Sequence, residues 1–113
     1  MKFSAVIISY NEAAKIARTI EALLPFTDDI VVFDSRSSDE TVTIAKALGV
    51  RVEEGEWQGY GPTKNKANSY AKHDWVLSVD ADEVISEELG KSILACKPKE
   101  NVIAFNLSFM SNY

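Results

Sequence analysis

Three carboxylates follow an apolar run near the middle of the chain. Residues 75–79 are Trp-Val-Leu-Ser-Val, and Asp80, Asp82 and Glu83 come directly after them. An apolar run without helical spacing is typical of a strand that is buried on both faces, as in a parallel sheet. Carboxylates this close repel each other unless they share a cation, take up a proton or are screened by water. We therefore predict that Asp80 and Asp82 hold Mg²⁺ or Mn²⁺, which leave ligand positions for water and substrate phosphate.

The simpler interpretation of Asp-Ala-Asp-Glu is a solvated turn that also caps the next helix. An Asp-x-Asp triplet on its own favours this interpretation. Metal binding becomes the better hypothesis only if other strands bring polar groups to the same edge of the sheet.

Length and composition limit the number of domains and the classes of ligand that the chain can bind. The 113 residues form one domain or part of one, with 46% hydrophobic residues and a net charge of −5. This charge gives no general attraction for nucleic acid or anionic lipid, so a phosphate ligand needs a metal. Cys96 is a single cysteine and fits a packing role, and no apolar run reaches the length of a membrane span. We expect a cytoplasmic location.

Strands and helices alternate along the chain. The expected strands cover residues 3–8, 30–33, 50–53, 75–79 and 101–109, and the expected helices cover residues 12–24, 37–48, 62–72 and 86–95. Residues 55–62 form a loop rich in glycine. The expected capping and boundary residues are Asn11, Pro25, Ser37 with Glu40, Gly49, Pro62 and Ser86. The pattern predicts an α/β fold with a mainly parallel sheet sandwiched between helices.

Polar residues follow three of the strands: Ser9-Tyr10-Asn11-Glu12, Asp34-Ser35 and Asp80-Ala81-Asp82. In a parallel sheet these strand ends converge on one crevice. Tyr10 offers an aromatic face for a base. Asp34 can accept hydrogen bonds from a base or ribose, or it can simply turn the chain and cap a helix.

Basic residues elsewhere have two interpretations each. Lys64 and Lys66 can meet phosphate or base, although exposed helix lysines are usually only solvated. His73 is the single histidine and fits a loop position better than a base or ligand. No glycine-rich dinucleotide motif and no P-loop motif is present, so a metal at Asp82 would have to offset a pyrophosphate and stabilise it as a leaving group.

Four segments together resemble family 2 glycosyltransferases of the GT-A fold, and most nearly the lipopolysaccharide core β-glucosyltransferase branch. These segments are S-Y-N-E, D-S-R-S-S-D-E-T, W-Q-G-Y-G-P-T-K-N-K-A and D-W-V-L-S-V-D-A-D-E. The resemblance implies that Asp82 ligates the metal and that Asp80 approaches ribose or metal-bound water. It further implies nucleotide contacts from Ser9, Tyr10, Asn11, Glu12, Asp34 and Lys64.

The chain departs from the family in two ways. Arg36 stands where the family usually has glycine, which costs strain if the position needs a positive φ. The family also continues into a half that binds the acceptor and supplies the general base. Residues 1–113 are therefore expected to be the donor-binding half of a GT-A domain, with the base beyond Tyr113.

The resemblance implies inverting transfer of glucose or a similar sugar from a UDP-sugar to a lipopolysaccharide or another glycan, including lipid-linked glycans. Peripheral association of the full-length enzyme with the inner face of the cytoplasmic membrane, and self-association through the C-terminal strand, are further expectations. One alternative is a truncated fragment that binds nucleotide without turnover. Another is a receiver-like phosphorylation module, although Ser9-Tyr10-Asn11 replaces the acid pair that such a module needs after its first strand.

Overall fold

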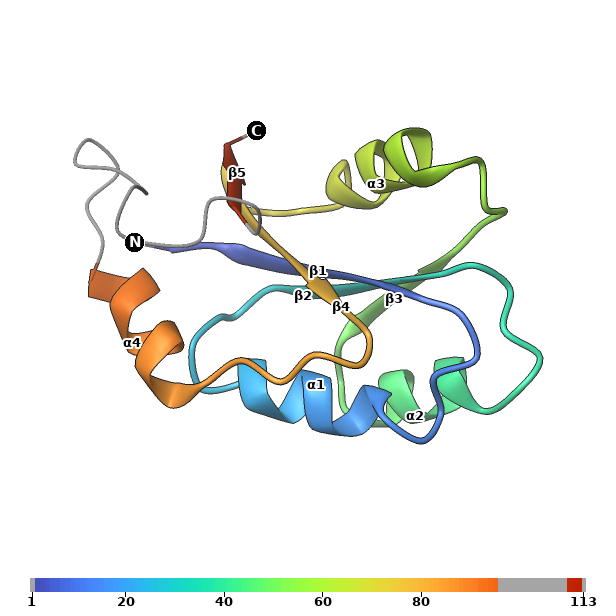
Figure 1. The fold of residues 1–113 in the computed structure, drawn as a ribbon, viewed down its shortest axis with the longest axis horizontal. Helices are drawn as coiled ribbons and strands as arrows, with labels where there is room; N and C mark the ends of the chain where they lie inside the picture. The colour runs from blue at the N-terminus through green and yellow to red at the C-terminus, as the bar shows by residue number, and fades with distance from the viewer. Residues whose placement is uncertain (1, 96–109, 113) are drawn as a thin grey trace.

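A five-stranded sheet forms the centre of the protein (Figure 1). The structure is a computed structural model that describes residues 2–95 and 110–112. Its elements are β1 (Ser4–Ser9), α1 (Ile16–Leu23), β2 (Ile30–Asp34), α2 (Thr41–Ala47), β3 (Arg51–Glu54), α3 (Tyr60–Asn68), β4 (Trp75–Asp80), α4 (Glu87–Ala95) and β5 (Met110–Asn112). The strand order is β3-β2-β1-β4-β5, and only β5 runs antiparallel to its neighbour. The predicted α/β fold with a mainly parallel sheet is confirmed.

The register of the central strands sets the position of the candidate site. Ser9 at the end of β1 lies opposite Asp34 of β2, and Ile8 lies opposite Asp80 of β4. The carboxyl ends of these three strands therefore share one edge of the sheet. This is the edge where parallel α/β sheets collect ligands.

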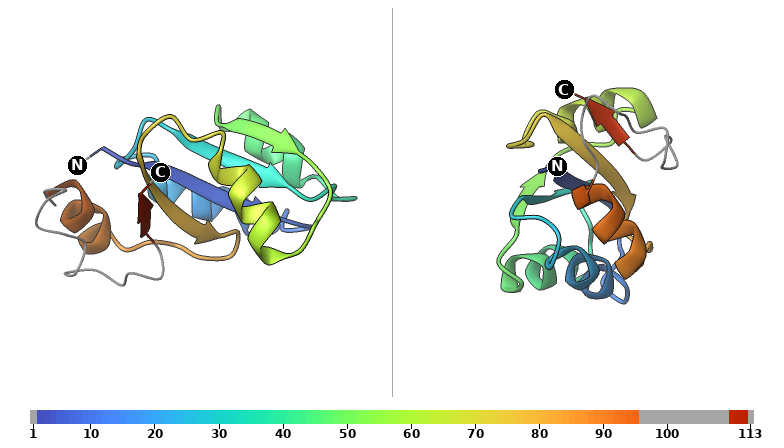
Figure 2. Two further views of the ribbon diagram at one scale, coloured as in Figure 1. Left: turned by 90° about the horizontal axis from the view of Figure 1, so that it is seen from above. Right: turned by 90° about the vertical axis from the view of Figure 1, so that its left-hand side faces the viewer.

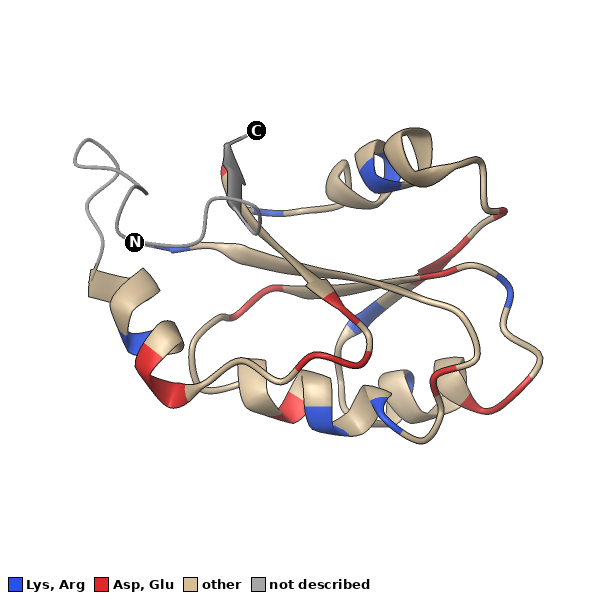
Figure 3. Cartoon of the chain, viewed as in Figure 1, with Lys and Arg blue, Asp and Glu red and all other residues tan. Residues whose placement is uncertain are grey.

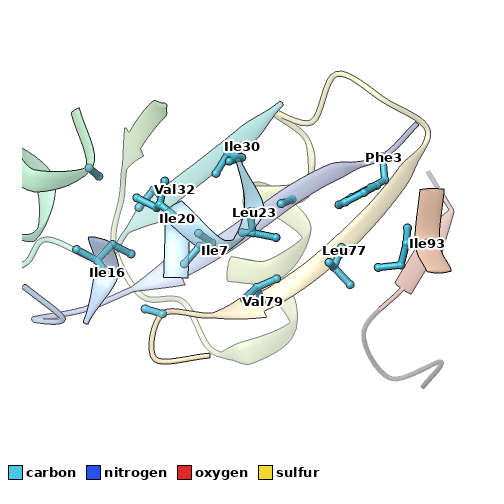
Figure 4. Close-up of a cluster of buried hydrophobic side chains, with 13 residues drawn as sticks. Phe3, Ile7, Ile16, Ile20, Leu23, Ile30, Val32, Leu77, Val79 and Ile93 are labelled. Carbon is cyan, nitrogen blue, oxygen red and sulfur yellow. The ribbon is translucent and has the colours of Figure 1, made fainter. Parts of the chain in front are cut away.

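Side chains of β1 alternate between two cores. Ala5 and Ile7 pack on one face with Ile16, Ile20 and Leu23 of α1 (Figure 4). Val6 faces the other way, into a smaller cluster that includes Ala67 of α3. Figure 2 shows α3 on the face of the sheet opposite to α1 and α2. The sheet is sandwiched between helices, as predicted.

The first helix begins later than its capping signal indicated. Asn11 was expected to cap a helix from residue 12, but α1 begins at Ile16. Asn11 instead has a φ of 51°, and its Oδ1 accepts a hydrogen bond from the backbone N–H of Ser38 at 2.8 Å. Its amide oxygen is thus used by the neighbouring loop.

The predicted capping box of Ser37 and Glu40 is also wrong. α2 begins at Thr41, and its N-cap Glu40 makes no side-chain capping bond. Ser37 is bonded to Asp34 instead, and the carboxylate of Asp39 accepts a hydrogen bond from the backbone N–H of Thr41. A nearby buried acceptor has therefore outcompeted the local capping pattern.

Other boundary signals hold. Gly49 follows α2 with a φ of 83°, which is the left-handed conformation expected after a helix. Oγ of Ser86 accepts a hydrogen bond from the N–H of Leu89 at 3.0 Å, as an N-cap does. Pro62 lies in the first turn of α3, although this helix already begins at Tyr60 and ends at Asn68. The glycine-rich loop is therefore shorter than predicted.

The strand predicted at residues 101–109 lies outside the described residues. Within residues 2–95 and 110–112, no helix combines the length and the apolar character that crossing a lipid bilayer requires.

Candidate functional site

A pocket of about 570 Å³ opens at the carboxyl edge of the sheet. Residues of the β1, β2 and β4 ends and of the β3–α3 loop line it: Ile8, Ser9, Tyr10, Glu12, Ser35, Trp57, Asp80, Ala81 and Asp82. Figure 3 shows acidic residues at the end of β4 and in the turn that follows. The three polar strand ends identified in the sequence do converge on one crevice.

The predicted site residues divide into two groups. Ser9, Tyr10, Glu12, Asp80 and Asp82 line this pocket, whereas Asn11, Asp34 and Lys64 are not among its lining residues. The roles of all eight residues toward a nucleotide or metal remain predictions. In the structure, the first group lies at the surface of the pocket and the second group lies outside it.

Asp34 is a buried hub beneath the pocket. Its side chain is fully buried, and Oδ1 accepts hydrogen bonds from the hydroxyls of Ser9 at 2.7 Å and Ser37 at 2.6 Å. Oδ2 accepts a third bond from the backbone N–H of Ser37 at 2.7 Å. Protein donors thus occupy both oxygens, and the carboxylate holds the β1 and β2 ends together.

Further bonds join the β1–α1 and β2–α2 loops. The N–H of Asn11 donates to Oγ of Ser37 at 2.7 Å, and the N–H of Glu12 donates to Oγ1 of Thr41 at 2.9 Å. Arg36 in the second loop has a φ of 58°. Arg36 therefore does adopt the positive φ that favours the glycine usual in the family. The hydrogen bonds between the two loops join them into one unit under the pocket.

Asp80 and Asp82 present free carboxylates at the rim. Both residues are exposed, and within the described part of the chain neither side chain forms a hydrogen bond or ion pair. Glu83 turns back instead: its Oε1 accepts a bond from the N–H of Asp80 at 2.9 Å. The carbonyl of Ala81, between the two aspartates, accepts a bond from the buried Thr19 hydroxyl at 2.8 Å. The turn is thus anchored from α1, while both aspartates stay exposed in the lining of the pocket.

The charges around the pocket favour a cation. Glu12, Asp80 and Asp82 contribute three carboxylates to its lining, and no lysine or arginine of the described residues lines it. Among the described residues, no group of three or more histidine, cysteine, aspartate or glutamate residues is placed to hold a metal. A cation here would therefore bind through one or two carboxylates and complete its shell with water or ligand oxygens, as Mg²⁺ and Mn²⁺ do.

Lys64 belongs to an adjoining pocket of about 150 Å³ on the α3 side. This pocket shares Ile8, Trp57 and Asp80 with the larger one. Nζ of Lys64 lies 5.6 Å from the ring centroid of Tyr60, within the range of a cation–π interaction. Lys66 lines neither of these two pockets.

Ser35 and Trp57 also line the pocket, although the prediction from sequence assigned neither of them a role. Oγ of Ser35 is buried and has no hydrogen-bond partner in the part of the chain that the structure describes, and Trp57 is 55% exposed. The sequence places Ser35 directly after Asp34, so the pairing of β1 with β2 could have suggested it. Trp57 lies in an irregular loop whose course no periodic pattern indicates.

His73 lies away from the pocket, as expected of a loop residue. Its Nε2 lies 2.7 Å from Oδ1 of Asp28, and Nζ of Lys72 lies 3.3 Å from Oδ2 of the same side chain. Hydrogen bonds from His73 and then Lys72 lower the pKa of Asp28 to about 2. These residues lie before β2 and β4, so they tie the opposite end of the sheet.

Residues 4–105 match glycosyl transferase family 2. The chain belongs to this family. It is 39% identical over 112 residues to an uncharacterized glycosyltransferase of Rickettsia bellii, covering 96% of this chain and 38% of the relative. It is also 33% identical over 85 residues to the glycosyltransferase SunS of Bacillus subtilis, covering 73% of this chain and 20% of the relative.

Solved structures of similar fold include the Staphylococcus aureus protein TarS (residues 1–349), with a TM-score of 0.74 and 28% identity over 84% of this chain and 32% of that one. Glucosyl-3-phosphoglycerate synthase of Mycobacterium tuberculosis, in complex with Mn²⁺, UDP and glucosyl-3-phosphoglycerate, has a TM-score of 0.64 and 27% identity, covering 71% of this chain and 33% of that one.

The predicted family and the GT-A type of fold are thereby confirmed. The chain spans about two fifths of the length of the first of these family relatives. The lipopolysaccharide core branch, which the sequence also suggested, stays a prediction.

Proposed function

We propose that the pocket binds the diphosphate of a nucleotide sugar, with UDP as the nucleotide, through a divalent cation held by Asp80 and Asp82. The observation that carries this proposal is the lining of the pocket, to which residues 2–95 and 110–112 contribute three carboxylates and no basic side chain. A diphosphate cannot approach such a lining without a counter-ion, because like charges at this range repel strongly. Structures of the mycobacterial synthase contain Mn²⁺ with UDP or UDP-glucose, and one structure of TarS contains UDP, which supports the assignment.

The residues of the pocket would then divide the donor between them. Asp82 and Asp80 supply the hard oxygen ligands that Mg²⁺ or Mn²⁺ prefers, and the bound ion would neutralise charge on the departing diphosphate. Tyr10 would offer its exposed ring to the base, while the buried hydrogen bond between Ser9 and Asp34 joins the ends of β1 and β2 next to it. Glu12 of the β1–α1 loop and Lys64 of α3 would border the nucleotide from the two adjoining pockets.

The reaction proposed for the whole enzyme is inverting sugar transfer. An acceptor hydroxyl attacks the anomeric carbon, the bond from this carbon to the UDP oxygen breaks, and a carboxylate base takes the hydroxyl proton. This base is expected in the part of the relatives' length that the chain does not span. Glucose as the sugar and a lipopolysaccharide-type or lipid-linked glycan as the acceptor follow from the sequence resemblance alone.

Calorimetric titration of the chain with UDP tests the proposal. UDP should bind with Mn²⁺ present and lose most of its affinity in EDTA, and pyrophosphate with Mn²⁺ should compete with it. Equal affinity in Mn²⁺ and in EDTA would refute the metal-dependent site.

A second candidate is donor binding without turnover. It is favoured by the coverage, because the chain matches only 38% of the first relative's length. A transfer and hydrolysis assay with radiolabelled UDP-glucose separates the two: binding without sugar release supports the second candidate, and transfer to a glycan acceptor supports the first.

A further inference from the structure

We propose that Trp57 closes the second face of a nucleobase site whose first face is Tyr10, with the hydroxyl of Ser35 meeting the edge of the base. This inference rests on the proposed function, because it identifies which part of a nucleotide occupies which part of the pocket. It adds two contacts, Trp57 and Ser35, to those that the sequence suggested.

The first observation is a pair of exposed aromatic side chains on one pocket. Tyr10 is 59% exposed and Trp57 is 55% exposed, and both line the pocket at the carboxyl edge. They come from the β1–α1 and β3–α3 loops, which lie at the same end of the sheet (Figure 1, right). Large aromatic surfaces left in water beside a pocket indicate a ligand that covers them, and the flat face of a nucleobase is a ligand that stacks on aromatic rings.

The second observation is that the backbone around Trp57 is anchored on both sides. The N–H of Gly55 donates to the carbonyl of Asp34 at 3.0 Å, and the N–H of Gln58 donates to Oγ1 of Thr63 at 2.9 Å. Gly55 is also in close contact with the core, since a Cβ there would lie 2.7 Å from Cζ of Phe33. The loop thus holds Trp57 at the pocket by built-in contacts.

The third observation is the hydroxyl of Ser35, which is independent of the aromatic pair. Its backbone N–H donates to the carbonyl of Ser9 at 2.8 Å, so the residue is fixed. Its Oγ is buried in the lining of the pocket and has no partner among the described residues. A buried hydroxyl without a partner is unfavourable until a ligand supplies one. The edge of a nucleobase carries both donors and acceptors and can supply it.

Charge then orients the nucleotide. Tyr10, Trp57 and Ser35 carry no charge, whereas Asp80 and Asp82 lie two residues apart at the end of β4. The third carboxylate of the lining, Glu12, stands alone in the β1–α1 loop. The neutral base therefore belongs with the aromatic pair, and the diphosphate with its cation belongs at the carboxylates.

Binding of UDP and of uridine to single variants tests the clamp, with Mn²⁺ present throughout. Trp57→Ala and Ser35→Ala should each weaken both ligands by about tenfold or more, since stacking and a buried hydrogen bond are each of that size. Trp57→Phe should keep most of the affinity. UDP should quench tryptophan fluorescence, and this quenching should survive in Trp75→Phe, whose indole packs against the core, but disappear in Trp57→Phe.

The outcomes distinguish a failure of the Trp57 and Ser35 contacts from a failure of the proposed metal-diphosphate site. If Trp57→Ala and Ser35→Ala bind UDP as tightly as the parent, the clamp is wrong and the metal-diphosphate site stands. Binding of pyrophosphate with Mn²⁺ but not of uridine leads to the same conclusion. If the parent binds neither UDP nor pyrophosphate with Mn²⁺, the proposed function itself is overturned, and the clamp with it.

Discussion

The hydroxyl of Ser9 donates a hydrogen bond of 2.7 Å to Oδ1 of Asp34, and this bond joins the ends of two neighbouring strands beneath the pocket. Asp34 accepts two further bonds from Ser37 in the next loop. One buried carboxylate thus holds the strand ends and the loop in the arrangement that creates the pocket.

Removing this carboxylate should destabilise the fold. Asp34→Ala leaves the buried hydroxyl of Ser9 and two half-buried donors of Ser37 without their acceptor, so we expect a loss of about 2–4 kcal/mol in the free energy of unfolding, measured by urea denaturation. Asp34→Asn retains one acceptor oxygen, so its free energy of unfolding should fall by about half as much. Glu54→Gln on the exposed end of β3 is the control and should stay within about 0.5 kcal/mol of the parent. Equal stability of Asp34→Ala and Glu54→Gln would show that the hub carries no stability.

Arg36→Gly should stabilise the protein. A residue with a side chain at a φ of 58° is strained by about 1–2 kcal/mol, and part of this is offset because glycine loses more entropy on folding. We expect the free energy of unfolding to rise by about 0.5–1 kcal/mol, as thermal or urea denaturation can measure.

Gly49→Ala provides the matched opposite case. Gly49 has a φ of 83° and open space around the position of a Cβ, so only backbone strain acts there. The Gly49→Ala variant should have a free energy of unfolding that is lower by about 1 kcal/mol. A less stable Arg36→Gly alongside a less stable Gly49→Ala would show that the Arg36 side chain makes contacts worth more than its strain.

The Asp28 ion pair predicts a stability change in acid. Bonds from His73 and Lys72 lower the pKa of Asp28 from 3.8 to about 2 in the folded state. Because the folded pKa is the lower one, this stabilisation is complete above pH 3.8 and is lost as the pH falls toward 2. The difference in urea midpoint between the parent and Asp28→Asn should therefore shrink between pH 5 and about pH 2.5. His73→Ala should remove most of the same pH dependence, and a constant midpoint difference would contradict the assignment.

Ligand binding should protect the two amides of the Trp57 loop that lie between its anchored residues. The amides of Gly55 and Gln58 are hydrogen-bonded and should exchange slowly in the free protein, while those of Glu56 and Trp57 should exchange fast. UDP with Mn²⁺ should slow exchange at Glu56 and Trp57, as hydrogen exchange followed by NMR can measure. Slow exchange at these two amides before UDP is added, unchanged afterwards, is the result that this prediction excludes.

Much of the fold could be predicted because local chemistry decides it. The apolar run before Asp80 forms β4, Gly49 follows α2 in the left-handed conformation, and Ser86 caps α4. In each case the signal and the structure it produces lie within a few residues of each other.

The loops at the site could not be predicted in the same way. Asn11 and Ser37 carry good capping signals, but their partners lie in other loops or under the pocket, 26 or 27 residues away in the case of Asn11. The roles of Ser35 and Trp57 depend on strand register and loop course, which no local pattern encodes. Hydrogen bonds to another loop, for Asn11, and to a buried carboxylate, for Ser37, therefore decide the conformation of these loops more than helix propensity does.

The central claim is that a carboxylate of the β4 turn holds the cation that binds the nucleotide, and Asp82→Asn tests it most directly. The measurement is the UDP dissociation constant in saturating Mn²⁺ and in EDTA, with the exposed Asp74→Asn as a variant of equal charge change before β4. We predict that Asp82→Asn weakens UDP by at least about tenfold in Mn²⁺, because it removes an ionised metal ligand, while Asp74→Asn binds like the parent. In EDTA all three proteins should bind equally weakly. An Asp82→Asn variant that binds UDP as tightly as the parent in Mn²⁺ would contradict the account and leave Asp82 as a residue of a solvated turn.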